Sequence, residues 1–181
     1  MIVGERVVLR ALEPEDAERC KRWINDPEVT HGLMARFPLS LAQERRWVEQ
    51  ERDPTRELHL AIETQHEEHI GNCGLLHVDA VQRSAALGIM IGEKEYWGQG
   101  YGSDAVLTLC GFAFRQMNLH RVSLRVLAFN ERAAACYRRC GFREEGRLRE
   151  AVFKHGEYHD VLVMGLLARE HREQWPERWG G

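Results

Sequence analysis

The chain lacks the sequence features that mark membrane, exported and nucleic-acid-binding proteins. No apolar run approaches the roughly 18 residues that a membrane-spanning helix needs. The N-terminus has no apolar segment of the kind found in signal peptides. A net charge of −3 provides no basic excess for binding nucleic acid. We therefore expect a cytoplasmic protein whose partners include neither membrane nor nucleic acid.

The placement of the cysteines suggests no special chemistry. The five cysteines are odd in number and scattered, which suits a reducing compartment. Cys136 and Cys140 are close in sequence, but no second Cys/His pair with zinc spacing accompanies them. We interpret both as small packing residues and expect no metal site. The 181 residues and 44% hydrophobic content suit one α/β domain with its own core.

Glycine, in contrast, is concentrated at one informative place. Gly98, Gly100 and Gly102 lie between a strand-like stretch, Ala86–Ile91, and a helix-like stretch that continues to about Met117. Without Cβ atoms, such a turn can adopt positive φ, so its backbone N–H groups converge beside the positive end of the helix dipole. The pattern predicts an anion-binding loop, with a ligand-free turn as the alternative.

Two common phosphate loops do not match this pattern. A nucleoside-triphosphate loop ends in Gly-Lys-Ser/Thr, which is absent here. A dinucleotide fingerprint needs a third glycine where Ser103 or Ala105 stands. A binder of nucleoside triphosphates is therefore the least favoured of the function classes.

A second informative segment lies downstream of the glycine loop. Val122–Ala128 alternates like a strand, and the alanine- and arginine-rich stretch after Asn130 favours a short helix. Asn130 is a good N-cap, and Gly141 suits the position just after the helix. Asn130 and Tyr137 are close to two helical turns apart, so both lie on about the same face. They can therefore reach one ligand.

Periodicity predicts a single α/β domain of the α+β type over residues 1–168. The predicted strands cover residues 6–12, 58–63, 70–78, 85–91, 122–128, 147–154 and 158–167. The predicted helices cover residues 14–24, 40–50, 103–117 and 131–140. A C-terminal tail, residues 169–181, contains Trp175 and Trp179 among charged residues. The tail is expected to dock on its own domain, to dock on a twin subunit in a homodimer, or to fray.

In four places the chain resembles the GNAT superfamily of N-acetyltransferases, most closely its RimJ/RimL-like branch. They are the opening strand with Glu13–Ala17, the segment Asn25–Val29, the loop Trp97–Gly102, and the set Asn130, Tyr137 and Gly141–Phe142. Many members have Arg or Gln where Trp97 stands, although Trp is frequent in the resembling branch. The resemblance implies a central mixed, mostly antiparallel sheet of about seven strands, splayed between strands 4 and 5 and flanked by about four helices.

The resemblance also implies that acetyl-CoA is the cosubstrate and lies in the splay between these two strands. The expected cofactor-binding residues are Ile89, Met90, Ile91, Trp97, Gly98, Gln99, Gly100, Tyr101, Gly102, Ser103, Asn130 and Arg132. Backbone groups of Ile89 and Ile91 would pair with the pantetheine, and amides between Gln99 and Ser103 would hold the pyrophosphate. Asn130 would bond the pantetheine arm. Arg132, Arg138 or Arg139 would meet the adenosine phosphates.

By the same resemblance, Tyr137 is the catalytic residue, and its residue type fits the chemistry. A neutral amine attacks a thioester carbonyl, charge builds on the carbonyl oxygen, and a thiolate must leave. A phenol with a reference pKa near 10 can protonate a thiolate whose thiol has a pKa near 8.5, provided that the two are hydrogen-bonded early. The alternative is that the Tyr137 ring packs in the core with its hydroxyl at the edge.

No residue stands out as the base that removes the amine proton. Arg125 stands where some relatives carry a catalytic glutamate, so that assignment fails. The candidates, directly or through water, are Glu93, His31, His120, His155 and His159. For each histidine, a solvated or structural role is the alternative.

Acceptor specificity is expected to come from residues 26–38 and from the late hairpin around residues 155–158. The predicted acceptor-binding residues are Glu28, His31, Phe37 and Glu93. The predicted activity is transfer of the acetyl group from acetyl-CoA to a primary amine by direct attack in a ternary complex. That amine is a protein N-terminal α-amine or a small-molecule amine. The alternative is a non-catalytic CoA-binding or regulatory module with the same fold.

Overall fold

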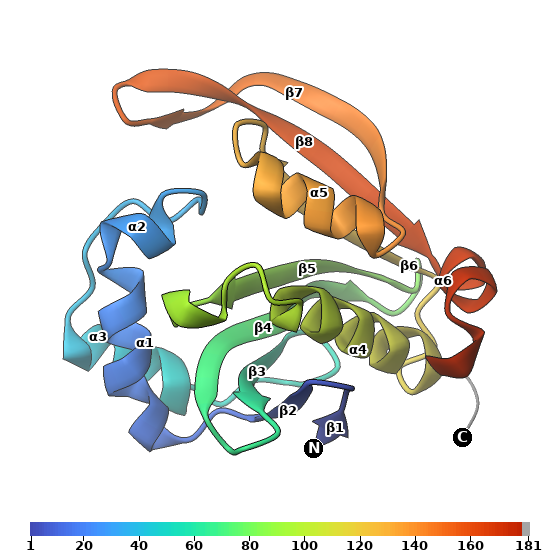
Figure 1. Ribbon diagram of the computed structural model, residues 1–181, viewed down its shortest axis with the longest axis horizontal. Helices are drawn as coiled ribbons and strands as arrows, with labels where there is room; N and C mark the ends of the chain where they lie inside the picture. Colours follow the sequence, from blue (N-terminus) through green and yellow to red (C-terminus); the bar gives the residue numbers. More distant parts are fainter. Residues whose placement is uncertain (179–181) are drawn as a thin grey trace.

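The computed structural model describes residues 1–178, which form one mixed sheet with helices on both faces (Figure 1). The strands are β1 (Ile2–Val3), β2 (Val7–Ala11), β3 (Leu58–Thr64), β4 (His69–Asp79), β5 (Ser84–Ile91), β6 (Arg121–Leu127), β7 (Arg143–Lys154) and β8 (Glu157–Leu167). The α-helices are α1 (Ala17–Ile24), α2 (Pro27–Thr30), α3 (Leu41–Glu49), α4 (Tyr101–Arg115), α5 (Glu131–Arg139) and α6 (Ala168–Gln174). Short 3-10 helices are η1 (Pro14–Asp16), η2 (Lys94–Tyr96) and η3 (Pro176–Arg178).

The strand order is β1-β2-β3-β4-β5-β6-β8-β7, and the site is positioned by the junction of β5 and β6. These two strands run parallel and pair only where Ser84–Ala86 meets Arg121–Ser123. Beyond that point β5 continues to Ile91 and β6 to Leu127 without further pairing between them. The predicted splay is therefore confirmed, and it opens the sheet at the C-terminal ends of both strands.

The helices cover both faces of the sheet. Leu109 of α4 and Ala134 of α5 lie in one large core together with inward-facing strand residues, and Ile89 of β5 packs against this core. Trp23 of α1 lies in a second cluster, against which Met90 of β5 packs. Successive residues of a strand point to opposite faces, so α4 and α5 lie on one side of β5 and α1 lies on the other. The splay joins these two sides.

A buried carboxylate fixes the start of α4 to the first strands and to the C-terminal segment. Asp104 accepts hydrogen bonds from the backbone N–H groups of Arg6 and Val7, at 2.8 and 3.1 Å. Its other oxygen accepts from the Arg178 guanidinium at 2.8 Å. In this way the described part of the tail docks on its own chain, whereas Trp179 lies outside the described residues.

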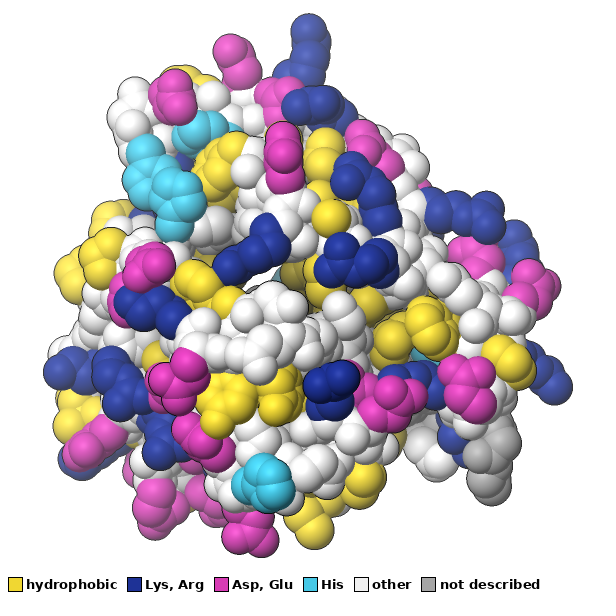
Figure 2. Space-filling model, in the orientation of Figure 1, with side chains coloured by type: hydrophobic (Ala, Val, Ile, Leu, Met, Phe, Trp, Pro, Cys, Tyr) yellow, Lys and Arg dark blue, Asp and Glu magenta, His cyan; other side chains and the backbone are white. Residues whose placement is uncertain are grey.

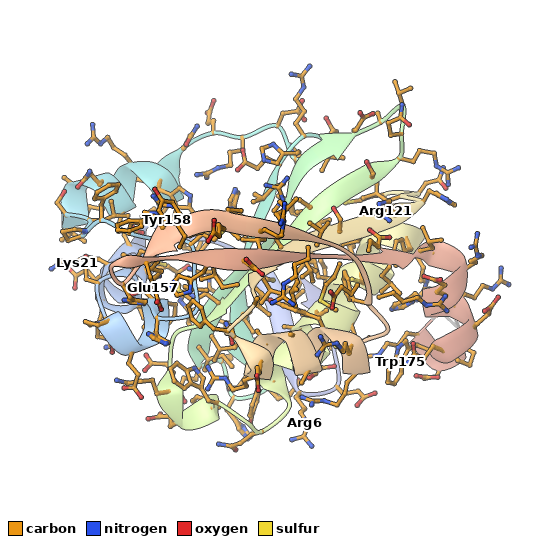
Figure 3. The ribbon with its side chains drawn as sticks, turned by 90° about the horizontal axis from the view of Figure 1, so that it is seen from above. Arg6, Lys21, Arg121, Glu157, Tyr158 and Trp175 are labelled. Carbon is orange, nitrogen blue, oxygen red and sulfur yellow. The ribbon has the colours of Figure 1, made fainter. Side chains whose placement is uncertain are left out.

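The long hairpin of β7 and β8 reaches from α6 across to the side of α2 (Figure 1). Figure 3, drawn from above, shows Tyr158 near its turn and Trp175, just after α6, toward the opposite end of the molecule. The strand β7 pairs with β8 but has no partner on its outer side in the described sheet. Only the turn end of the hairpin therefore lies near α2.

The fold class is confirmed, while the count and bounds of the elements differ from prediction. The sheet has eight strands because β1, at two residues, is too short to show alternation. The strand β7 begins at Arg143 rather than at Arg147, since two register shifts interrupt its periodicity. The helices α2 and α6 were not predicted, because both are short and rich in polar residues. No described helix has the length and apolar content needed to cross a membrane.

Candidate active site

A cleft of about 940 Å³ lies where β5 and β6 diverge. In Figure 2 this face is hollowed near its centre, with Lys and Arg side chains on either side of the hollow. The predicted site residues that line the cleft are Glu28, His31, Ile89, Met90, Ile91, Trp97, Gly98, Gly100, Gly102, Ser103, Asn130, Arg132 and Tyr137. The structure therefore brings together segments from three distant parts of the chain.

Four other predicted residues do not line this cleft. The Gln99 side chain donates to the backbone carbonyl of Glu95, and the Tyr101 ring packs edge-on against Tyr96. Phe37 lines a second pocket of about 410 Å³ and is 78% exposed. Glu93 forms an ion pair with Arg22 on α1. Two of the four predicted acceptor-binding residues, Phe37 and Glu93, therefore lie away from the cleft.

The glycine loop has the backbone geometry of an anion cradle. Gly98 and Gly100 adopt φ of 75° and 90°, a left-handed conformation that side chains with a Cβ rarely adopt. Gly102 lies within α4, so positive φ is needed at two of the three glycines. The first helical amides, at Tyr101, Gly102 and Ser103, have no acceptor within the helix. They lie at the positive end of a 15-residue helix and can donate to a diphosphate.

Trp97 and Arg132 bridge the two sides of the cleft. The Trp97 indole N–H donates to the backbone carbonyl of Ile91 at 2.9 Å, so this carbonyl already has a partner at the expected pantetheine position. The Arg132 guanidinium lies 4.2 Å from the centre of the Trp97 ring. Such a cation–π contact links the glycine loop to the start of α5. Arg132 therefore contacts an aromatic ring, in addition to any phosphate that it binds.

Asn130 caps α5 as predicted and also binds the α2–α3 loop. Its side-chain oxygen accepts from the Ala133 N–H at 3.2 Å, and its side-chain nitrogen donates to the Gly32 carbonyl at 3.1 Å. A Cβ on Gly32 would lie 2.2 Å from that nitrogen, so only glycine permits the approach. The amide of Asn130 thus links the acceptor-side loop to α5.

Tyr137 lines the cleft from α5, with its ring in contact with Phe142 at 6.0 Å between centres. Burial raises the pKa of its phenol, because the charged phenolate would lose solvation. Negative charge on the neighbouring Cys136 raises this pKa further. The phenol therefore keeps its proton at neutral pH, as a general acid must before it donates.

Cys136 is a cleft residue that the sequence analysis treated only as packing. Its thiol lies 3.1 Å from the Ser103 hydroxyl, at the first turn of α4. Hydrogen bonds from Cys140 and Ser103, with the charges of Arg139 and Arg132, lower the pKa of the Cys136 thiol. The bond with Cys136, together with burial, raises the pKa of Cys140. The i, i+4 spacing of the two cysteines is the only sequence signal for this pair.

Lys154, near the end of β7, holds the α2–α3 loop in place. Its ammonium donates to the backbone carbonyls of Thr30 at 2.6 Å and Ala35 at 3.1 Å, and also to that of Leu33. Burial and the charge of Arg36 lower the pKa of Lys154. No local sequence pattern signals this contact, because more than 100 residues separate Lys154 from the loop.

Three of the candidate bases gather around Phe129 at one end of the cleft. The His31 and His155 rings stack with centres 4.8 Å apart, and the His159 ring meets Phe129 edge-on at 4.7 Å. Of these histidines only His31 lines the cleft. His120 lies at the other end of β6, where its backbone pairs with Arg83. Within residues 1–178, no group of His, Cys, Asp or Glu side chains is arranged to hold a metal ion.

The two acidic residues predicted to bind the acceptor, Glu28 and Glu93, are already paired with cations. Lys94 lies 2.7 Å from a carboxylate oxygen of Glu28 and 3.0 Å from one of Asp26. The Lys94 hydrogen bond lowers the pKa of Asp26. Arg22 forms an ion pair with Glu93. The charge on the predicted acceptor-binding acids is therefore largely offset by cations of the chain itself.

Comparison with known proteins agrees with this geometry. Residues 6–143 match the family described as acetyltransferase (GNAT) domain. The chain is 32% identical over 179 residues to the putative ribosomal N-acetyltransferase YdaF of Bacillus subtilis (strain 168), which covers 93% of this chain and 94% of that protein. It is 32% identical over 115 residues to spermidine N(1)-acetyltransferase of Vibrio cholerae serotype O1, covering 64% of this chain and 66% of that protein.

A solved structure places a ligand in the same fold. The crystal structure of spermidine N-acetyltransferase from Vibrio cholerae in complex with CoA and spermine has a TM-score of 0.85 and 28% sequence identity. The match covers 92% of this chain and 98% of that chain. The cradle, the splay and the cleft of this protein fit the same cosubstrate. The chain belongs to the GNAT acetyltransferase family and is an acetyl-CoA-dependent N-acetyltransferase.

Proposed function

We propose that the protein acetylates a primary amine, either a protein N-terminal α-amine or a small-molecule amine, by direct attack within a ternary complex. We further propose that it belongs to the RimJ/RimL-like branch. The observation that carries the first proposal is one continuous cleft that contains the glycine loop, Tyr137 and the α2–α3 loop. Cofactor-side and acceptor-side residues share this cavity, so both substrates can be bound together.

The residues of the chain have separate roles in this reaction. Bound acetyl-CoA supplies the acetyl thioester. The amides from Gly100 to Ser103 bind its diphosphate and thereby fix its position along the splay. The Tyr137 phenol, kept protonated by burial, donates its proton to the departing thiolate.

Among the candidate bases, the geometry favours His31. It lines the cleft, whereas Glu93 is paired with Arg22 and His120 lies at the far end of β6. The need for a base depends on the acceptor. An α-amine with a pKa near 8 is about one-tenth neutral at pH 7, while an amine near 10.4 is neutral in only about one part in 2,000. An α-amine therefore depends less on a base than a more basic amine does.

Acetyl transfer is tested by measuring thiol release from acetyl-CoA in the presence of pools of peptides, amino acids, polyamines and aminoglycosides. Wild-type protein should release thiol with at least one pool. Tyr137→Phe should bind acetyl-CoA as well as wild type in calorimetry, while its kcat falls about 10²- to 10⁴-fold. An unchanged kcat in this variant would remove Tyr137 from the catalytic role.

The same experiment separates the enzyme from the non-catalytic alternative. Family membership favours the enzyme. Tight binding of acetyl-CoA without thiol release for any acceptor pool would instead favour a CoA-binding or regulatory module.

A further inference from the structure

Arg125 is a charged residue of the cleft that the proposed reaction does not use. Its neighbours on β6, Leu124 and Val126, are buried in the large core that includes Ala134 of α5. Arg125 lies between them in the strand, so its side chain points to the opposite face. It is exposed and lines the cleft. This face is the one on which Met90 of β5 packs against the α1 cluster, that is, the acceptor side.

No acidic partner compensates Arg125. Within residues 1–178, none of the carboxylates lies within ion-pair distance of its guanidinium, and no side chain or backbone oxygen accepts a hydrogen bond from it. Glu28 and Glu93, the two acids predicted to bind the acceptor, are instead paired with Lys94 and Arg22. The cleft therefore presents an unpaired guanidinium, while the two predicted acceptor-binding acids are paired with cations.

Arg125 is poorly placed to serve the cosubstrate. The anion cradle of Gly98 and Gly100 leads into α4, and α4 packs on the opposite face of β5. The arginines that line the cleft from α5 are Arg132 and Arg139, which can meet the phosphates. The guanidinium of Arg125, on the other face, is suited to planar anions, because its N–H groups match the two oxygens of a carboxylate.

We infer that the acceptor is a primary amine that also carries a carboxylate, and that Arg125 binds this carboxylate. The inference rests on the proposed function and narrows its substrate class. A polyamine would place a second positive charge near Arg125, where repulsion opposes binding. Two sources can supply the required chemistry: a free amino acid, through its α-carboxylate, or a peptide N-terminus with an acidic side chain close behind it.

The test compares acceptors that differ by one carboxylate. The free amino acid alanine is paired with alaninamide, the peptide amide Ser-Glu-Ala-Ala is paired with Ser-Gln-Ala-Ala, and spermidine is the cationic acceptor. For the favoured pair, wild-type kcat/KM should be about 10- to 100-fold higher for the carboxylate member. The pair that shows this preference identifies the source.

Variants then assign the preference to Arg125. Arg125→Gln should remove the preference, and Arg125→Glu should reverse it in favour of spermidine, while KM for acetyl-CoA stays within about twofold of wild type. Arg56→Gln is the matched control, because Arg56 is 84% exposed at its side chain and lies outside the cleft. This control should keep the wild-type preference.

Two failures can be told apart. If wild type releases thiol but prefers spermidine or the amide members, or if Arg125→Gln keeps the carboxylate preference, the inference on the substrate class is wrong and acetyl transfer stands. If no acceptor supports thiol release, the proposed function is wrong. In that case calorimetry with the CoA-loaded protein still decides the inference, which requires that a carboxylate-bearing acceptor binds and that Arg125→Gln abolishes this binding.

Discussion

The two sides of the cleft are built differently. The cofactor side consists mainly of backbone, namely the left-handed glycines Gly98 and Gly100 and the first amides of α4. The acceptor side consists of side chains from distant segments, and Lys154 and Asn130 hold its loop by bonds to backbone carbonyls. A backbone cradle binds any molecule with the same diphosphate, whereas side chains distinguish one amine from another. The proposed function thus assigns cosubstrate binding to the backbone of one side and acceptor choice to the side chains of the other.

Gly100→Val should have the largest effect on CoA binding. A β-branched residue at φ of 90° is strained by about 1–2 kcal/mol, so the loop shifts and its amides no longer converge. We expect the Kd for CoA, measured by calorimetry, to rise about 10- to 100-fold. The control is Gly156→Val, which has φ of 84° in the β7–β8 turn and should leave CoA binding unchanged. Equal effects of the two variants would contradict a local role for Gly100.

Alkylation of Cys136 should report on the cofactor side without a mutation. The lowered pKa gives this thiol a larger thiolate fraction at pH 7, and we expect iodoacetamide to modify it several-fold faster than an ordinary cysteine. The thiolate fraction grows as the pH rises through the pKa, so the rate should reach half its maximum at a pH below the ordinary value of about 8.5. Bound CoA should protect the thiol, since Cys136 lines the cleft.

Mass spectrometry of tryptic peptides after timed alkylation gives the rate for each cysteine. Burial raises the pKa of Cys20 to about 11, so Cys20 serves as the internal slow control. A Cys136 rate that keeps rising through pH 8–9, or one that CoA does not change, would contradict the described environment.

Lys154→Met tests the acceptor side. Removing the ammonium leaves the carbonyls of Thr30 and Ala35 without their donor, which we expect to lower the free energy of unfolding by about 1–2 kcal/mol. The loop should lose order, so KM for the acceptor rises about three- to tenfold while CoA binding is kept. Denaturant unfolding and steady-state kinetics measure the two effects. Lys21→Met, at an exposed position on α1, should change neither.

The smallest effect is expected from Arg132→Gln, which removes the contact between the glycine loop and α5. A half-exposed cation–π pair contributes about 0.5–1 kcal/mol, so CoA should dissociate about two- to fivefold faster. Stopped-flow displacement of a fluorescent CoA analogue measures this rate. Acceleration of a hundredfold would show that Arg132 mainly binds phosphate and that its contact with Trp97 is incidental.

The glycine loop and the α5 residues of the cleft could be located from sequence because their signals are local, while their roles toward the cosubstrate stay predictions. The glycines stand directly before α4, and Asn130 and Tyr137 share one short helix, so spacing alone places them. The strand alternation also located β5 and β6, and with them the splay. Each of these features depends on residues that are near in the chain.

The acceptor side could not be predicted in the same way. Phe37 was expected at the site, but the structure places it at the second pocket. The hydrogen bonds from Lys154 to Thr30 and from Asn130 to Gly32 join residues about 100 positions apart or more, and no local pattern signals such contacts. The boundary at residue 168, the cytoplasmic setting and the homodimer stay predictions.

Hydrogen–deuterium exchange of the backbone amides at residues 98–103, with and without CoA, tests the central claim most directly. The amides of Tyr101, Gly102 and Ser103 have no helical acceptor and should exchange quickly in the free protein. If they bind the cosubstrate diphosphate, CoA should slow their exchange more than that of any segment on the acceptor side. Saturating CoA that leaves these amides unprotected, while protecting another part of the chain, would contradict the account.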